Sequence, residues 1–174
     1  MKTEPRRRTR RIAGSGAAAA PRVCLWLRNE AGRRGVPVLR SFEKWIDAIP
    51  ELRERDNWTE LNILIVGSAA GRRLNREFRD RDYATNVLSF PYEPMPGEHT
   101  GLLGDLVICA PVIAREARDQ GKPPRDHYAH MTIHGVLHLL GYDHETGREA
   151  ARMEALERAI LASLGVADPY AELA

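Results

Sequence analysis

The 174-residue sequence lacks the features that mark disulfide-rich, membrane-spanning and repetitive proteins. Its 2 cysteines, Cys24 and Cys109, lie in apolar, strand-like runs, so they predict buried thiols, not a disulfide framework, and they suit the cytoplasm. No segment approaches the ~20 apolar residues of a membrane helix, and no internal repeat is present. Aromatic residues make up only 6%, which offers no obvious platform for stacking nucleic-acid bases. With 43% hydrophobic and 29% charged residues, the chain has the composition of one ordinary globular domain.

A secretory signal is also missing, although the N-terminus is strongly basic. Residues 1–20 contain six basic residues and one acidic residue, and Ile12 is the only large apolar residue after the arginine run. A signal peptide needs a longer apolar stretch. We therefore predict that residues 1–20 are a disordered extension with a net charge of +5. The remaining 20 basic and 23 acidic residues give residues 21–174 a net charge of −3.

Hydrophobic patterning after this extension predicts a single α+β domain over residues 21–174. Strands are expected over residues 23–29, 61–66, 87–90 and 102–109, and helices over residues 38–49, 68–78, 110–120, 123–140 and 146–164. Pro50 ends the first helical pattern and Gly141 the fourth, while Thr146 and Glu149 have the spacing of a capping box. Together these elements indicate a small mixed four-stranded sheet covered by about four to five helices.

The segment HGVLHLLGYDH, residues 134–144, carries the strongest chemical signal in the chain. His134 and His138 are four residues apart, so a helix places both imidazoles on one face. Gly141 then lets the chain reverse, which brings His144 back toward the same point. Three imidazoles with no nearby cysteine are typical of a catalytic zinc site whose fourth position is left for water.

Other residues around this segment have two possible roles each. Gly135 is costly inside a helix, by about 1 kcal/mol relative to alanine, which indicates a close approach to its backbone by a substrate or simply by the sheet. Metalloproteases of the HExxH type carry a glutamate there, so its absence argues against peptide hydrolysis. His130, one turn earlier, is expected to touch a ligand histidine or to be packed, and Asp143 to hydrogen-bond an imidazole or to shape the turn. His127 and His99 are expected to be solvated.

Five ordered motifs give the chain a specific resemblance. HGVLHLLGYDH is preceded by LNREFR (residues 74–79), TNVLSFP (residues 85–91) and LLGDLVIC (residues 102–109), and DPY follows at residues 168–170. Over most of residues 22–170 the sequence resembles the YbeY family, the bacterial metal-dependent endoribonucleases of ribosomal RNA maturation. Asn86 departs from the acidic residue of many relatives, so no carboxylate base is assigned there.

The resemblance implies a zincin-like fold and one Zn²⁺ ion per chain, bound by His134, His138 and His144. It implies cleavage of single-stranded RNA in small-subunit ribosomal RNA maturation, at the 16S 3′ end, and in ribosome quality control. It also implies a catalytic arginine at Arg79, where a guanidinium can hold the scissile phosphate. Without the resemblance, the five arginines of residues 72–81 are equal candidates. The nucleophile, a water-derived hydroxide or a 2′-hydroxyl, stays open.

The resemblance further suggests a small-subunit ribosomal protein and an Era-type GTPase as partners. Two other functions remain compatible with the residues: a non-catalytic, zinc-containing ribosome-assembly factor, and a metallohydrolase that acts on a substrate other than RNA. Local charge favours RNA on one side of the molecule, because residues 72–81 have a net charge of +3 while residues 143–172 have a net charge of −4.

Overall fold

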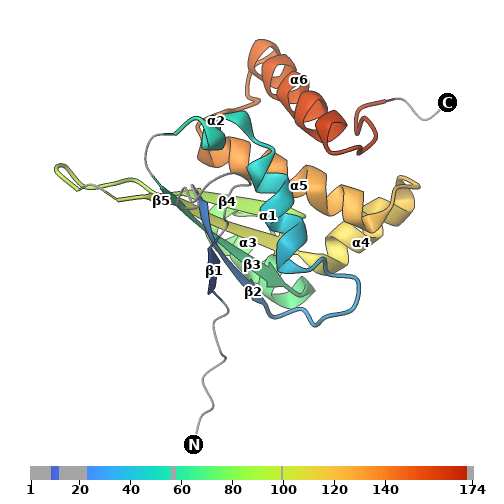
Figure 1. The fold of residues 1–174 in the computed structure, drawn as a ribbon. Helices are drawn as coiled ribbons and strands as arrows, with labels where there is room; N and C mark the ends of the chain where they lie inside the picture. The colour runs from blue at the N-terminus through green and yellow to red at the C-terminus, as the bar shows by residue number, and fades with distance from the viewer. Residues whose placement is uncertain (1–8, 12–22, 56–57, 99, 172–174) are drawn as a thin grey trace, which may run out of the picture.

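A mixed β-sheet forms the middle of the computed structural model, which describes residues 9–11, 23–55, 58–98 and 100–171 (Figure 1). In spatial order its strands are β1 (Thr9–Arg11), β2 (Val23–Asn29), β3 (Thr59–Val66), β5 (Leu102–Cys109) and β4 (Val87–Pro91). The three inner strands are parallel, whereas β1 and β4 pair antiparallel at the two edges. The predicted α+β fold is confirmed, and all four predicted strands are present.

The sheet has five strands, not the four that were predicted. The additional strand, β1, lies within the segment predicted to be disordered, and it pairs with residues 24–26 of β2. Pairing along the edge of a sheet uses backbone hydrogen bonds and needs no apolar side chain, so hydrophobic patterning did not reveal this strand. Residues 1–8 and 12–20 of the predicted extension lie outside the described residues.

Strand β3 is central because both of its faces are covered. Leu61, Ile63 and Ile65 point into the larger hydrophobic core, while Leu64 and Val66 pack into a smaller core on the opposite face of the sheet. A strand buried on both faces needs a nearly continuous apolar sequence, which explains the LNILIV run.

The helices divide between these two faces. The larger core is covered by α1 (Leu39–Asp47), α2 (Pro50–Arg53), α5 (Pro124–Leu139) and α6 (Gly147–Ser163). Helix α3 (Ser68–Arg79) covers the smaller core, and α4 (Ala110–Asp119) contributes to both. In Figure 1, α1 and α5 lie in front of the sheet and α3 behind it. None of the helices within the described ranges is long and apolar enough to cross a bilayer.

Helix α5 is buried on most sides because it lies between the sheet and α6. Its buried side chains include Ala129, Ile133, Val136 and Leu137. One stripe along the helix is only partly buried and carries three histidines at four-residue spacing, His130, His134 and His138. These imidazoles therefore lie along the one partly exposed side of an otherwise buried helix.

Candidate metal centre

Three histidines converge at the end of α5 and in the turn after it. The Nε2 atoms of His134 and His138 are 3.2 Å apart. Gly141 adopts a φ of 91°, and the chain reverses there. The ring of His144 then lies with its centroid 5.0 Å from that of His138 and 5.7 Å from that of His134. One ring nitrogen from each residue lies within 4.8 Å of the other two.

The spacing of these nitrogens suits a metal ion. Tetrahedral bonds of about 2.0–2.1 Å place two ligand nitrogens about 3.3 Å apart, and the His134–His138 pair is at 3.2 Å. The other separations are at most 4.8 Å, and His144 is exposed, so rotation of its ring can close the site. Within the described part of the chain, the group contains no cysteine or carboxylate as a fourth ligand. The group can therefore hold a metal ion and leave one position open.

The environment of His138 favours its metal-binding form. Burial, reinforced by the neighbouring imidazoles of His134 and His144, lowers the pKa of His138. A lower pKa keeps the imidazole neutral near pH 7, and only a neutral imidazole nitrogen offers a lone pair to a metal.

Glu157 touches this group from α6, although it was not among the residues predicted from the sequence. Glu157 is fully buried, and its Oε1 atom is 2.7 Å from Nδ1 of His134. Its Oε2 atom is 2.9 Å from Nε2 of His130 and also accepts a hydrogen bond from the Tyr170 hydroxyl. Burial alone would raise the pKa of Glu157, but the hydrogen bonds from His130, His134 and Tyr170 lower it to about 2. The carboxylate is therefore ionised and only accepts hydrogen bonds.

A sequence signal for Glu157 exists in the periodicity of α6. Met153, Ile160 and Leu161 form the buried face of this helix, and Glu157 lies on the same face at helical spacing. An acidic residue on an apolar helix face is rare unless it is paired. That pattern points to a partner but does not say which residue the partner is.

His130 and Asp143, two of the three residues with alternative predicted roles, each contact a group at this centre. His130 hydrogen-bonds the same carboxylate as His134, with 6.3 Å between the two ring centroids. Asp143 accepts a hydrogen bond at 2.7 Å from the backbone N–H of His144, which is the turn-shaping role. Its negative charge also raises the pKa of His138, against the larger effect of burial.

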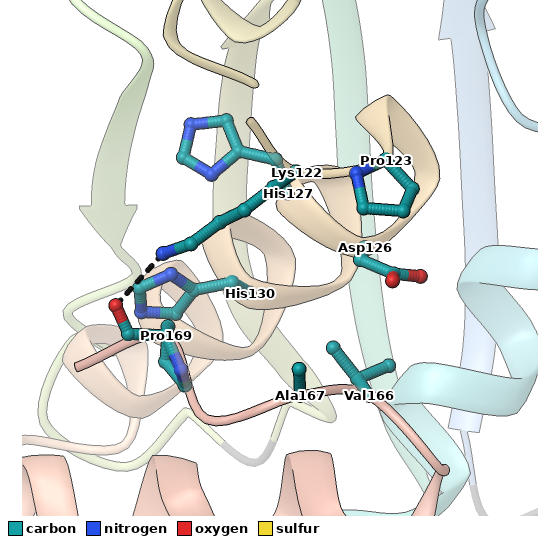
Figure 2. A pocket seen from close by; sticks show the side chains of 8 residues that line it. All are labelled: Lys122, Pro123, Asp126, His127, His130, Val166, Ala167 and Pro169. Atoms are coloured by element: carbon teal, nitrogen blue, oxygen red, sulfur yellow. Dashed lines mark hydrogen bonds between the residues drawn. The ribbon is translucent and has the colours of Figure 1, made fainter. Parts of the chain in front are cut away.

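The expectation that His127 is solvated is wrong. Only 4% of its surface is exposed, and its Nε2 atom is 2.7 Å from Oε2 of Glu116. Glu116 belongs to α4, which packs across the first turn of α5, and it also accepts a hydrogen bond from the Asn86 side chain. Figure 2 shows His127 and His130 together in the lining of a small pocket beside Lys122 and Pro169. His99 lies outside the described residues.

Gly135 faces the sheet. A Cβ atom built on it would lie 2.9 Å from Leu106 Cδ2 and 3.2 Å from both Ser89 Oγ and Val87 Cγ2. The Ser89 hydroxyl donates a hydrogen bond of 3.1 Å to the Gly135 carbonyl. The close approach inferred from the sequence is therefore that of strands β4 and β5, which the absent side chain lets α5 contact directly.

Arg79 is the last residue of α3, and its side chain is exposed. The preceding residue, Phe78, packs edge-on against Phe90 of β4, with 5.0 Å between the ring centroids. The end of α3 thus lies beside the edge strand β4, which α5 also contacts. Arg72 and Arg76 pair with Asp82, whereas Arg79 makes no ion pair within the described ranges.

Most of the sequence matches a known protein family. The family described as Endoribonuclease YbeY matches residues 29–165. The protein named Endoribonuclease YbeY from Alkalilimnicola ehrlichii is 56% identical over 142 residues, which are 80% of this chain and 86% of that protein. The protein of the same name from Stenotrophomonas maltophilia strain R551-3 is 57% identical over 143 residues, 80% of this chain and 88% of that protein.

The fold has a counterpart among solved structures. The solution structure of TM1509 from Thermotoga maritima superposes with a TM-score of 0.51, covering 84% of this chain and 99% of that one. The two sequences are 22% identical, so this likeness supports the fold and not the chemistry.

Proposed function

Because the chain belongs to the endoribonuclease YbeY family, a family of hydrolases that act on RNA, we propose that it is a zinc-dependent endoribonuclease specific for single-stranded RNA. The observation that carries the proposal is the convergence of His134, His138 and His144 with one position left open. An all-imidazole set with an open position is the donor set of a catalytic zinc site. The missing glutamate at position 135 separates this site from that of an HExxH protease.

In this proposal the histidines and Arg79 have different roles. His134, His138 and His144 hold the ion, which when bound supplies a Lewis acid for a phosphate oxygen and lowers the pKa of water to about 7. Arg79 binds the scissile phosphate through its exposed guanidinium and neutralises the charge that develops there. An RNA strand that contacts both Arg79 and the histidines reaches from one face of the sheet to the other, because α3 and α5 lie on opposite faces.

Three further residues support this centre in the proposal. Gly135 lets α5 lie directly against β4 and so fixes the height of the histidine stripe above the sheet. Asp143 shapes the turn that returns His144 to the site. His130 acts through the carboxylate of Glu157 and does not bind the metal.

Family membership supports a proposal for the physiological setting. We propose that residues 21–174 form the catalytic domain and that residues 1–20 are a basic extension outside it. The substrate is precursor small-subunit ribosomal RNA, at the 16S 3′ end, with a further role in ribosome quality control in the cytoplasm. The acidic segment 143–172, with a net charge of −4, supports contact with a basic ribosomal protein, and an Era-type GTPase is the second proposed partner.

The substitution His144→Ala tests the proposed centre with the least effect on folding, because His144 is exposed. We expect the variant to lose bound zinc and to cleave single-stranded RNA more than 100-fold more slowly, since removing a ligand exceeds the roughly 10–100-fold effect of removing an outer partner. Zinc content by atomic absorption and cleavage rates on single-stranded and duplex RNA are the measurements.

Arg148→Ala, an exposed residue four positions further along, is the matched control and should keep both properties. Full RNA cleavage by a zinc-free His144→Ala protein would refute the proposal. Wild-type protein that cleaves peptide or ester substrates but not RNA would favour a different metallohydrolase. Wild-type protein that binds zinc but cleaves none of these substrates would favour the assembly factor.

A further inference from the structure

The carboxylate of Glu157 joins three segments that are distant in sequence. Its two oxygens accept hydrogen bonds from His130 and His134 of α5 and from Tyr170 of the segment that follows α6. The side chain is fully buried, so no bulk water replaces a lost donor. A buried carboxylate with this many donors has a fixed position, because each hydrogen bond restrains one of its two oxygens.

The contact with His134 determines which ring nitrogen faces the other histidines. The two Glu157 oxygens face three groups that can each donate a hydrogen bond, the Tyr170 hydroxyl and one ring nitrogen each of His130 and His134. In this arrangement Nδ1 of His134 is the nitrogen that carries the hydrogen. The Nε2 atom is then left with its lone pair, and it is this atom that lies 3.2 Å from Nε2 of His138. Glu157 therefore holds both the tautomer and the ring orientation that a metal requires of His134.

The segment after α6 folds back over this carboxylate. Lys122 Nζ donates a hydrogen bond of 2.8 Å to the Pro169 carbonyl, as Figure 2 shows. Arg158 lies 4.9 Å from the centre of the Tyr170 ring and donates a 3.2 Å hydrogen bond to Asp168. These contacts from α6 and from the loop before α5 direct the Tyr170 hydroxyl onto Glu157.

We propose that Glu157 is the positioning residue of His134 and that Tyr170 holds Glu157 in place, so that the C-terminal segment controls the zinc affinity of the site. This inference rests on the proposed function, because it assumes that His134 binds a metal. A purely structural role for the network would change the stability of the metal-free protein and leave its affinity for zinc unchanged.

The test compares zinc affinity among three glutamate and tyrosine variants. Glu157→Gln keeps the shape of the side chain, but its amide group cannot accept all three hydrogen bonds, and we expect zinc to bind roughly 10–100-fold more weakly. Tyr170→Phe removes only the hydroxyl and should weaken binding by a smaller factor. Glu77→Gln makes the same chemical change in an exposed residue of α3, on the other side of the sheet from this network, and should leave the affinity unchanged.

Affinity is measured by competition with a chromophoric chelator, which needs no RNA. A second readout is the ¹⁵N spectrum of the metal-free imidazoles. Wild type should show His134 with hydrogen on Nδ1, and Glu157→Gln should show a mixture of tautomers. Should Glu157→Gln fail to fold, Tyr170→Phe carries both measurements.

The outcomes separate this inference from the proposed function. Weaker zinc binding together with mixed tautomers supports it. Glu157→Gln and Tyr170→Phe proteins that bind zinc as tightly as Glu77→Gln overturn the inference and leave the proposed centre intact. Wild-type protein that binds no zinc overturns both.

Discussion

Gly104 of β5 allows three elements to meet beside the metal centre. Its φ is 146°, and a Cβ built there would lie 2.3 Å from the Phe90 carbonyl of β4 and 3.0 Å from Leu139 Cδ2 of α5. We expect Gly104→Ala to lower the free energy of unfolding by roughly 2–5 kcal/mol, because backbone strain and overpacking both contribute. Urea unfolding followed by circular dichroism measures this loss.

Gly97→Ala is the matched control, since Gly97 has a φ of 86° and no atom within 4 Å of a built Cβ. Gly97→Ala should lower the free energy of unfolding only by the cost of backbone strain, roughly 1–2 kcal/mol. Equal losses in the two variants would mean that the contact with β4 and α5 does not limit the residue at position 104.

The site residues that sequence analysis found are those joined by local geometry. His134 and His138 lie one helical turn apart, and His144 follows the chain reversal at Gly141, so their spacing in the sequence is enough to bring them together. Glu157 could not be placed in the same way, because its contact with His134 depends on how α6 packs on α5. His127 was misjudged for the same reason, since α4 covers it and no local pattern shows that packing.

At the scale of the element, α6, the helix that carries Glu157, begins with a capped first turn. The Thr146 side chain accepts a hydrogen bond from the Glu149 backbone, and Glu149 accepts one from the Thr146 backbone, so the predicted capping box is confirmed. We expect Thr146→Ala to lower the free energy of unfolding by about 0.5–2 kcal/mol, since the backbone N–H of Glu149 loses its acceptor and the Glu149 carboxylate loses the hydrogen bond from the Thr146 hydroxyl. Thermal and urea unfolding of the metal-free protein measure the change.

Arg148→Ala tests the same helical turn without touching the cap, because Arg148 is exposed within it. Its stability should stay within about 0.5 kcal/mol of wild type. A loss in Arg148→Ala as large as that in Thr146→Ala would show that this helical turn is sensitive to any truncated side chain, and would not support the capping box as the cause, because alanine itself favours a helix.

The elements that the sequence predicted share strong periodicity or strong boundary residues. Strand β2 was predicted with its observed bounds, and β3 begins two residues earlier than predicted, at Thr59. The two missed elements are short: α2 has 4 residues and β1 has 3. Pro50 is predicted to end a helix, but it also begins α2. Proline suits the first helical position because the N–H that it lacks would have no partner within the helix there. Segments this short have no measurable period, so tertiary packing and strand pairing decide their structure.

At the scale of the whole molecule, the formal charge of +2 is an average over unlike regions. The acidic segment 143–172 includes α6, which covers α5, whereas α3 and its arginines lie on the other face of the sheet. Because RNA is attracted by local potential and not by net charge, the arginine-rich face and the N-terminal extension are where its phosphates are expected to bind.

Deleting residues 1–20 separates these two sources of RNA affinity. The deletion removes six basic residues, and each phosphate contact on a single strand contributes about 0.7 to the slope of log affinity against log salt. We expect that slope to become shallower by up to roughly 4, with weaker RNA binding at low salt. Fluorescence anisotropy with a labelled single strand, across a salt series, measures the slope.

Zinc affinity should be unchanged by the same deletion, because the family match begins at residue 29 and the three histidines lie on α5 and the turn after it. The deletion also removes β1, but β2 keeps its parallel pairing with β3 through seven residue pairs. Loss of zinc on deletion would show that the domain begins before residue 21 and that β1 is part of its stable sheet. An unchanged salt slope would instead mean that the arginines of the domain alone bind the RNA phosphates.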